Sequence, residues 1–213
     1  MVRRKQSVSM KTEKPLRLET VRLILRPYRM SDAVDVARHL KDRAVTRYTY
    51  IPHPYTIDDY RQFLRRIRSP KRRAHNVVFA IVDKSAGKVI GAVGVHGIDE
   101  TKRSTEIGYW LAKPYWGKGI VVEALNRIVE YLFRERKLLR VFAHVWHPNA
   151  KSARVLEKAG FTHEGRLRRD IKRNGRWMDV LLFGLLREEW AKMQKTRRSK
   201  PSGSATKPKG PKA

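Results

Sequence analysis

A strand that leads through a short glycine loop directly into a helix is the feature of this sequence that most restricts its fold. The strand is expected at Thr105–Leu111, the loop at Tyr115–Gly119 and the helix at Val121–Arg136. Gly117 and Gly119 allow a ligand to approach the backbone closely. The helix start adds about four unpaired N–H groups and roughly half a positive charge. This unit predicts a cradle for an anion such as a pyrophosphate, although an ordinary tight turn has the same pattern.

Two familiar phosphate-binding motifs do not fit this loop. The dinucleotide pattern G-x-G-x-x-G fails because Val122 stands three positions after Gly119. The P-loop pattern fails because no G-K-S or G-K-T occurs. The loop therefore indicates phosphate binding without indicating a dinucleotide or a nucleoside triphosphate.

The other periodic segments predict a mixed sheet with helices on both faces, in an α/β fold. The expected strands are Leu16–Leu25, Val77–Val82, Val89–Val95, Arg140–Trp146, Thr162–Asp170 and Trp177–Leu185. The expected helices are Ser31–Leu40, a segment from Thr56 or Asp58 to Ser69, and Ala150–Ala159, with Asn149 as its N-cap and Gly160 as its stop.

Burial can be predicted for three of these segments. In the long helix, Leu125, Ile128, Val129 and Leu132 share one face, which we expect to be buried. In the first helix, with Ser31 as N-cap, the inner side is expected to carry Val34, Ala37 and His39 or Leu40. The apolar stripe Trp177–Leu185 is expected to be core, and Tyr48–Thr56, with two prolines, is expected to be a loop.

The charge is strongly unbalanced. The chain has 49 Lys and Arg against 20 Asp and Glu, a net charge of +29. Residues 1–14 and 192–213 are basic and poor in apolar side chains, so we expect disordered tails around one folded domain at 15–191. A basic surface attracts polyanions such as RNA, but the same charge also serves solubility or reflects the host's composition. No nucleic-acid-binding motif accompanies it.

Several classes of protein are excluded by composition. The absence of cysteine excludes a disulfide scaffold, a thiolate zinc site, an iron–sulfur cluster and a cysteine nucleophile. The longest apolar run, Val180–Leu186, is far shorter than the ~20 residues of a membrane span. The basic N-terminus lacks the apolar stretch of a secretory signal, so the cytoplasm is expected. His144 and His147 lack a third ligand, so no metal site is expected.

Five segments in order resemble the GNAT acyltransferases, most closely the RimJ and RimL type of ribosomal-protein N-terminal acetyltransferases. These are RLETVRLILRP at 17–27, IGYWLAKPYWGKG at 107–119, VVEAL at 121–125, HPNAKSARVLEKAGF at 147–161 and NGRWMDVLLFGLLREEW at 174–190. The resemblance covers about Leu16–Trp190. It implies a single, twisted, mostly antiparallel mixed sheet, with acetyl-coenzyme A as co-substrate.

The resemblance also implies where the donor binds. The pantetheine arm would lie along the backbone of Leu111, Ala112 and Lys113, and the pyrophosphate on the loop after them. The remaining donor-binding positions are Trp116, Gly117, Lys118, Gly119, Ile120, Val121, Val122, Asn149 and Ser152. The family loop often begins with Gln or Arg where this chain has Pro114.

Catalytic and acceptor residues are carried over in the same way. Glu106 matches the carboxylate that removes the amine proton; the alternative is a solvated strand residue. Ser152 matches a serine that protonates or anchors the leaving sulfur, the tyrosine of other relatives being replaced here by Leu156; the alternative is backbone capping. The acceptor wall would contain Tyr48, Tyr50, Tyr55 and Tyr109, with aromatic packing as the alternative.

The predicted function is transfer of acetyl from acetyl-coenzyme A to a primary amine by direct attack in a ternary complex. The first-ranked acceptor is a protein N-terminal α-amine, and the second is a small amine such as a polyamine or an aminoglycoside. A protein of this fold that binds coenzyme A or nucleic acid without turnover is the alternative of another class. RNA or the ribosome is a candidate partner of the basic tails, and the chain is expected to be a monomer or homodimer.

Overall fold

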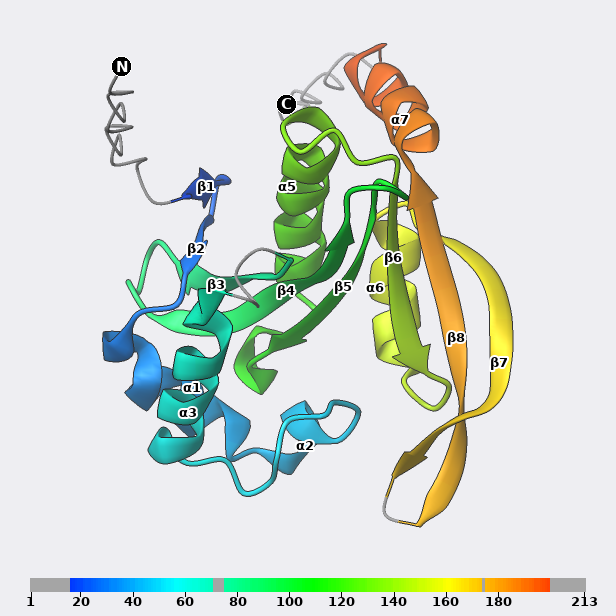
Figure 1. The fold of residues 1–213 in the computed structure, drawn as a ribbon. Coiled ribbons are helices and arrows are strands. Elements are labelled where there is room, and N and C mark those ends of the chain that lie inside the picture. The colour runs from blue at the N-terminus through cyan, green and yellow to red at the C-terminus, as the bar shows by residue number, and fades with distance from the viewer. Residues whose placement is uncertain (1–15, 71–74, 174, 200–213) are drawn as a thin grey trace, which may run out of the picture.

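The computed structural model describes residues 16–70, 75–173 and 175–199, which form one eight-stranded sheet flanked by helices (Figure 1). The strand order is β1-β2-β3-β4-β5-β6-β8-β7. All neighbouring strands are antiparallel except β5 and β6, which are parallel, so the predicted mixed, mostly antiparallel sheet is confirmed. The strands are β1 (Leu18–Glu19), β2 (Leu23–Pro27), β3 (Val77–Asp83), β4 (Val89–Asp99), β5 (Ser104–Leu111), β6 (Arg140–Trp146), β7 (Thr162–Arg173) and β8 (Arg176–Leu186).

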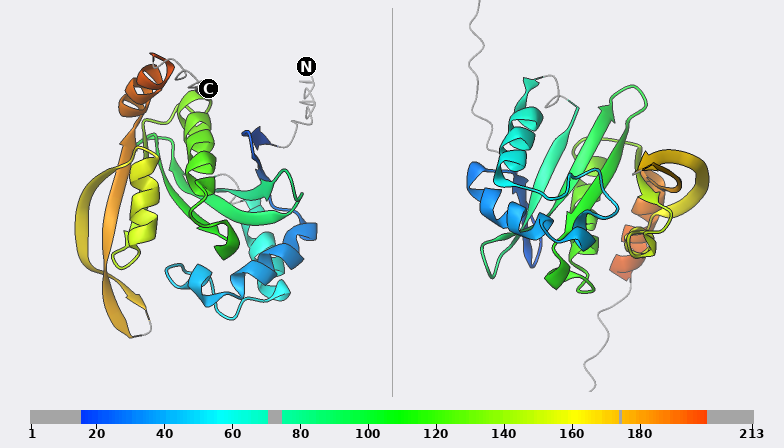
Figure 2. Two further views of the ribbon diagram at one scale, coloured as in Figure 1. Left: turned by 180° about the vertical axis from the view of Figure 1, so that it is seen from behind. Right: turned by 90° about the horizontal axis from the view of Figure 1, so that it is seen from below.

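The helices cover both faces of this sheet (Figure 2). Alternation along β3 separates two cores: Phe79 and Ile81 pack with the helices α5 and α6, whereas Ala80 and Val82 pack with α1 and α3. The helical elements are η1 (Met30–Asp32), α1 (Ala33–Leu40), α2 (Arg43–Thr46), α3 (Ile57–Arg68), η2 (Lys113–Tyr115), α5 (Ile120–Arg134), α6 (Ala150–Lys158) and α7 (Arg187–Ser199). In the described ranges, every helix is too short or too polar to span a bilayer.

Two helix starts follow the predicted capping chemistry. The Thr56 hydroxyl accepts a hydrogen bond from the Asp59 amide (3.1 Å), and the Asp59 carboxylate accepts one from the Thr56 amide (2.8 Å). This capping box selects Thr56 over Asp58 as the start of α3. The Asn149 side chain accepts a hydrogen bond from the Ser152 amide (3.3 Å), as an N-cap should.

The start of α1 was predicted wrongly. The Asp32 carboxylate accepts a hydrogen bond from the Arg29 amide (2.7 Å). It also accepts one from each of the two terminal guanidinium nitrogens of Arg26 (2.8 and 2.7 Å). These bonds hold the 3-10 turn η1 in front of the helix, so Ser31 is not its N-cap. Ala37 and Leu40 are buried on the inner side of the helix as predicted, but Val34 is 57% exposed, and Ala33 and Val36 are buried in its stead.

The C-terminal end also differs from expectation. The folded region was predicted to end at residue 191, but α7 continues to Ser199, anchored by the Trp190 ring, which lies 5.6 Å from that of Phe133. Residues 1–14 and 200–213 of the predicted tails lie outside the described residues. Trp177 is 56% exposed and not core, because β7 and β8 continue past the end of β6, where Trp146 pairs with Val180. We call this two-stranded extension, residues 168–173 and 175–179, the ribbon.

The parallel pair β5–β6 opens into a fork. Pairing covers only Ser104–Glu106 against Arg140–Phe142, although both strands continue beyond it. The two strands therefore separate after Glu106, and the sheet is interrupted in its middle. This interruption positions the site described next.

Candidate active site

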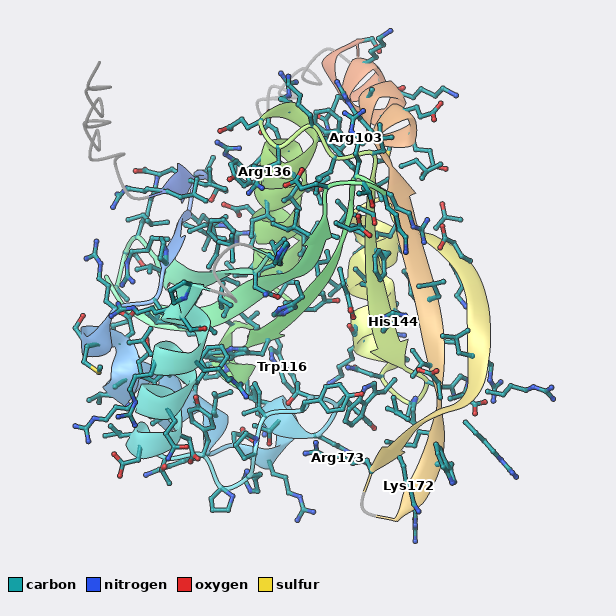
Figure 3. The ribbon with its side chains drawn as sticks, in the orientation of Figure 1. Arg103, Trp116, Arg136, His144, Lys172 and Arg173 are labelled. Atoms are coloured by element: carbon teal, nitrogen blue, oxygen red, sulfur yellow. The ribbon has the colours of Figure 1, made fainter. Side chains whose placement is uncertain are left out.

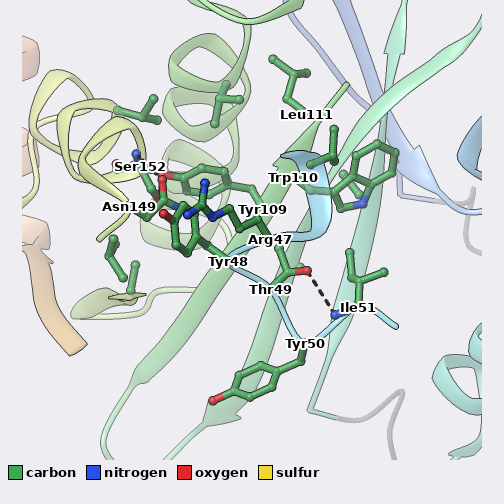
Figure 4. Close-up of a pocket in the computed structure, with 18 of the residues that line it drawn as sticks. Arg47, Tyr48, Thr49, Tyr50, Ile51, Tyr109, Trp110, Leu111, Asn149 and Ser152 are labelled. Carbon is green, nitrogen blue, oxygen red and sulfur yellow. Dashed lines mark hydrogen bonds between the residues drawn. The ribbon is translucent and has the colours of Figure 1, made fainter. Parts of the chain in front are cut away.

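A cleft of about 1800 Å³ occupies the fork between β5 and β6. Its walls come from the outer half of β5, the start of α5, the start of α6 and the loop between α2 and α3. Figure 4 shows Arg47 and Tyr48 reaching from that loop toward Tyr109, Asn149 and Ser152. The cleft thus brings together most of the residues that the sequence singled out.

The edge of β5 offers backbone groups to this cleft. The Ala112 amide donates to the Ile90 carbonyl (2.8 Å) across the β4 side. Backbone groups alternate in direction along a strand, so those of Tyr109 and Leu111 point to the opposite side, where β6 has diverged. The Ala112 carbonyl already accepts a bond from the Tyr115 amide (3.0 Å). On the open side of β5, the described backbone groups nearest the loop are therefore those of Tyr109 and the Leu111 amide, because the Leu111 carbonyl accepts a hydrogen bond from the Trp116 indole (2.7 Å). The contacts of Leu111, Ala112 and Lys113 with a donor stay predictions.

The glycine loop has the left-handed backbone that its composition favours. Gly117 has φ 76° and Gly119, the N-cap of α5, has φ 71°. No side chain caps the first turn of α5, so the amides of Ile120, Val121 and Val122 remain directed at the cleft end of the helix. Such a helix start favours an anion.

The loop is held from behind by charged side chains. The Arg22 guanidinium donates to the Lys118 carbonyl (3.0 Å) and to the Glu123 carboxylate (2.6 Å). The Thr20 hydroxyl donates to the same carboxylate (2.5 Å). These bonds tie the turn between β1 and β2 to the glycine loop and the first turn of α5.

Ser152 and Tyr109 form a hydroxyl pair. Their oxygens lie 2.7 Å apart, and the Tyr109 hydroxyl also donates to the Ser152 carbonyl (3.1 Å). Burial raises the pKa of Tyr109, so the phenol stays protonated. Leu156, where other relatives are expected to carry tyrosine, is fully buried. Tyr109, placed in the acceptor wall by the sequence, is thus the partner of the candidate acid Ser152.

Glu106 lies at the apex of the fork, and its carboxylate is 2.9 Å from Nδ1 of His144. The hydrogen bond to Glu106 raises the pKa of His144. This pairing was not predicted, because His144 was weighed only as a metal ligand. Alternation places Phe142 and His144 on one face of β6, but the position of Glu106 opposite Phe142 is set by the register of the two strands.

The proposed acceptor-wall tyrosines have different environments. Tyr48 and Tyr50 line the cleft; Tyr50 is 71% exposed and meets Trp146 edge-on at 5.3 Å. Arg173, from the ribbon, lies 5.5 Å from the same Trp146 ring. Tyr55 is buried in the core beneath α1 and α3, and this burial raises its pKa to about 12. Tyr55 therefore has less surface to offer an acceptor than Tyr48 or Tyr50.

Comparison with known proteins identifies the family. Residues 22–162 match the model of the acetyltransferase (GNAT) domain. The chain is 35% identical over 175 residues to the Bacillus licheniformis protein "Uncharacterized N-acetyltransferase p20", an alignment that covers 82% of this chain and 98% of the relative.

Two solved structures share the fold over nearly their whole length. The ribosomal-protein-S5-alanine acetyltransferase of Vibrio fischeri superposes with a TM-score of 0.70 at 28% identity, over 82% of this chain and 98% of that one. The spermidine N-acetyltransferase of Vibrio cholerae, in complex with CoA and spermine, gives 0.69 at 25% identity, over 81% and 99%. These likenesses confirm the resemblance to the ribosomal-protein type and favour an enzyme over a protein that only binds. With a cleft at the fork of its sheet and a glycine loop at its helix start, the chain belongs to the GNAT family of acetyl-CoA-dependent N-acetyltransferases.

Proposed function

We propose that the acceptor of this N-acetyltransferase is the N-terminal α-amine of a protein, which attacks acetyl-CoA directly in a ternary complex. The carrying observation is the cleft at the fork, which is lined by the glycine loop and by Tyr48 and Tyr50. We assign the glycine-loop side to the donor and the Tyr50 side to the acceptor. Tyr48, Tyr50 and Trp146 give the acceptor side broad aromatic surfaces of the kind that peptide side chains pack against.

A polyamine is the weaker candidate for this cleft, although one relative is named for spermidine. Arg47 and Arg66 line the acceptor side, and Arg173 stacks at its rim. These cations would repel an acceptor with several ammonium groups, whereas a protein N-terminus brings one. The carboxylates that line the cleft, Asp59, Glu106 and Asp170, are outnumbered by its cationic side chains, which are Arg47, Arg66, Lys151, Arg154 and Lys158.

The donor fits the geometry. The backbone of Tyr109 and Leu111 would pair with the amide-rich pantetheine arm, and the amides at 117–122 would hold the pyrophosphate. Asn149 and Ser152 border the same space at the start of α6. Bound acetyl-CoA would supply the acetyl group as an activated thioester.

Two proton transfers are assigned to this chain's own side chains. An α-amine has a pKa of about 7.7–8.0 and must lose a proton before it can attack. We assign the removal of this proton to the Glu106 end of the cleft. The leaving thiolate needs a proton or a hydrogen bond, which we assign to Ser152. The hydrogen bond between the Ser152 hydroxyl and the Tyr109 phenol holds the Ser152 hydroxyl in place.

The test is an acceptor panel with wild type and Glu106→Gln. Wild type should acetylate peptides with a free N-terminus, and not the same peptides with a blocked N-terminus, and should prefer them to spermidine by kcat/KM. Glu106→Gln should cut kcat by about 10²–10⁴-fold and leave the calorimetric Kd for acetyl-CoA unchanged. Preference for spermidine over every peptide would refute the proposed acceptor, and unaltered turnover in the variant would refute the role of Glu106.

We also propose that RNA is a partner of this basic chain. RNA would bind at the ribbon, and the positive charge of the terminal residues would add to the attraction. Arg168, Arg169, Lys172 and Arg176 are exposed there, and Figure 3 shows Lys172 and Arg173 near the ribbon tip. The exposed Trp177 lies beneath Lys172 at 5.7 Å and presents a surface on which a base can stack.

RNA binding is checked by titration at several salt concentrations. Changing Arg168, Arg169 and Arg176 together to Gln should weaken binding and flatten the slope of log K against log salt by about 0.7 for each lost phosphate contact. The control changes three exposed lysines away from the ribbon, Lys41, Lys88 and Lys102, to Gln. Equal losses in both triple variants would indicate attraction by net charge alone and remove the ribbon as a site.

A further inference from the structure

Three titratable side chains stand in a row across the middle of the sheet. His96 on β4 pairs directly with Glu106 on β5, and Glu106 is bonded to His144 on β6. All three line the cleft. The row crosses the apex of the fork, where the parallel pairing ends, so its outer side is open to a substrate.

The bond between His144 and Glu106 determines which ring nitrogen is available. An ionised carboxylate only accepts hydrogen bonds, so Nδ1 of His144 must carry the proton that is donated to Glu106. In the neutral ring, Nε2 then holds the free lone pair. Within the described ranges, Nε2 has no hydrogen-bond partner. The imidazole is thus oriented like a histidine that serves as a base, with a carboxylate behind it.

The acidity of the groups favours imidazole over carboxylate as the proton acceptor. A free glutamate carboxyl has a pKa of about 4.3, an imidazole about 6.5 and an α-amine about 7.7–8.0. Transfer of a proton from a protonated amine therefore costs much less free energy when the acceptor is an imidazole than when it is a carboxylate. The hydrogen bond to Glu106 raises the pKa of His144 and so brings it closer to the pKa of the amine.

Burial of the ring lowers the pKa of His144 and partly offsets the bond to Glu106, whereas the nearby side chains raise this pKa or are neutral. Asp170, on β7, adds a second negative charge that raises the pKa of His144. Leu182, its partner on β8, carries no charge. On β6 itself, the nearest cation, Arg140, is held by the Glu164 carboxylate (2.5 Å). The imidazolium is consequently stabilised from two sides.

We infer that Nε2 of His144 takes the proton from the acceptor amine and that Glu106 is the positioning residue that holds its tautomer. The inference rests on the proposed amine acceptor. The bond that forms joins the amine nitrogen to the acetyl carbonyl carbon, and the carbon–sulfur bond breaks. The proton that the ammonium group loses before attack goes to Nε2. The electron pair of the broken bond leaves on sulfur, which is protonated from the Ser152 side, and the second proton that the nitrogen loses as the carbon–sulfur bond breaks replaces the one given to sulfur.

The experiment compares His144→Gln, Glu106→Gln and the control His147→Gln, which changes an exposed histidine outside the cleft. Each is assayed with one acceptor from about pH 5.5 to 9, so that the amine's own titration is common to all. His144→Gln should lower kcat about 10²–10⁴-fold and abolish the enzyme's own contribution to the acidic limb, so that only the titration of the amine remains. Glu106→Gln should keep the enzyme's contribution but move it to lower pH. His147→Gln should match wild type.

NMR titration of the histidine ring protons gives a readout that is independent of turnover. The His144 resonance should titrate at a higher pH in wild type than in Glu106→Gln, and the His147 resonance should not change. A wild-type acidic limb in His144→Gln, or a His144 titration that ignores Glu106, would overturn the inference while leaving the proposed acceptor intact. Failure of wild type to acetylate any amine, despite calorimetric binding of acetyl-CoA, would refute the proposed function and this inference with it.

Discussion

The indole N–H of Trp116 donates a hydrogen bond to the carbonyl oxygen of Leu111 (2.7 Å) and so closes the turn between β5 and the glycine loop. Without this bond, the last residue of β5 and the first residue of the loop would be linked only through the short turn η2. Lys151, from α6, covers the same indole at 4.9 Å. Trp116 thus connects three walls of the donor side of the cleft.

Trp116→Phe should weaken acetyl-CoA binding because it removes this bond and keeps most of the ring. A net hydrogen bond is worth about 1 kcal/mol, so the free energy of unfolding should fall by about that amount and Kd should rise about fivefold. Calorimetry and urea unfolding measure the two effects. Trp177→Phe, at an exposed ribbon position, is the control and should change neither. Unchanged affinity in Trp116→Phe would show that the loop is set without the indole.

Gly119→Ala should separate loop geometry from general stability. The left-handed φ of 71° costs an alanine about 1–2 kcal/mol, and the added methyl would meet only Arg22, at 3.8 Å. Gly87, with φ 65° and open space around it, is the matched control in a turn outside the cleft. Both variants should lose similar stability in thermal unfolding. Only Gly119→Ala should lose acetyl-CoA affinity, by about tenfold; equal affinities would exclude the loop as the phosphate site.

Tyr109→Phe and Ser152→Ala should not have additive effects on kcat. The two hydroxyls share one 2.7 Å contact, so removal of either breaks that contact, although the Tyr109 hydroxyl would keep its bond to the carbonyl of residue 152 in Ser152→Ala. The double variant should be about as slow as the slower single variant. Steady-state rates of the four proteins provide the measurement. Additive losses would mean that the two hydroxyls act independently.

The pair of His144 and Glu106 should make stability depend on pH with a defined sign. The bond to Glu106 raises the folded-state pKa of His144, so folding favours the protonated ring. The resulting stabilisation is fully present below the unfolded pKa of about 6.5 and is lost as the pH rises through the folded-state value. Urea unfolding should therefore show a larger difference between wild type and Glu106→Gln at about pH 5.5 than at about pH 8.5. The opposite trend would contradict the pairing.

The features predicted best from sequence are those encoded within one segment. The apolar face of α5 (Leu125, Ile128, Val129, Leu132) is buried, β6 has the predicted bounds, and the caps at Thr56 and Asn149 are those expected. Each depends on side chains a few positions apart, so periodicity and capping chemistry suffice to predict it.

The features missed are those set by contacts between distant segments. The pairing of Glu106 with His144 requires the register of two parallel strands, which no local pattern specifies. The bond between Tyr109 and Ser152 joins β5 to α6 in the same way. The start of α1 was missed because the ion pair of Arg26 with Asp32 is a contact between a strand and a turn.

The fork between β5 and β6 would make a bound donor part of the sheet itself. Only three residue pairs join these two strands, so the molecule consists of two half-sheets that meet along a short seam. A pantetheine arm against Tyr109 and Leu111 would lengthen that seam as a further strand does, with the ligand in place of a length of chain. Substrate binding and product release would then change how firmly the halves are joined, and each catalytic cycle would close and reopen the middle of the fold.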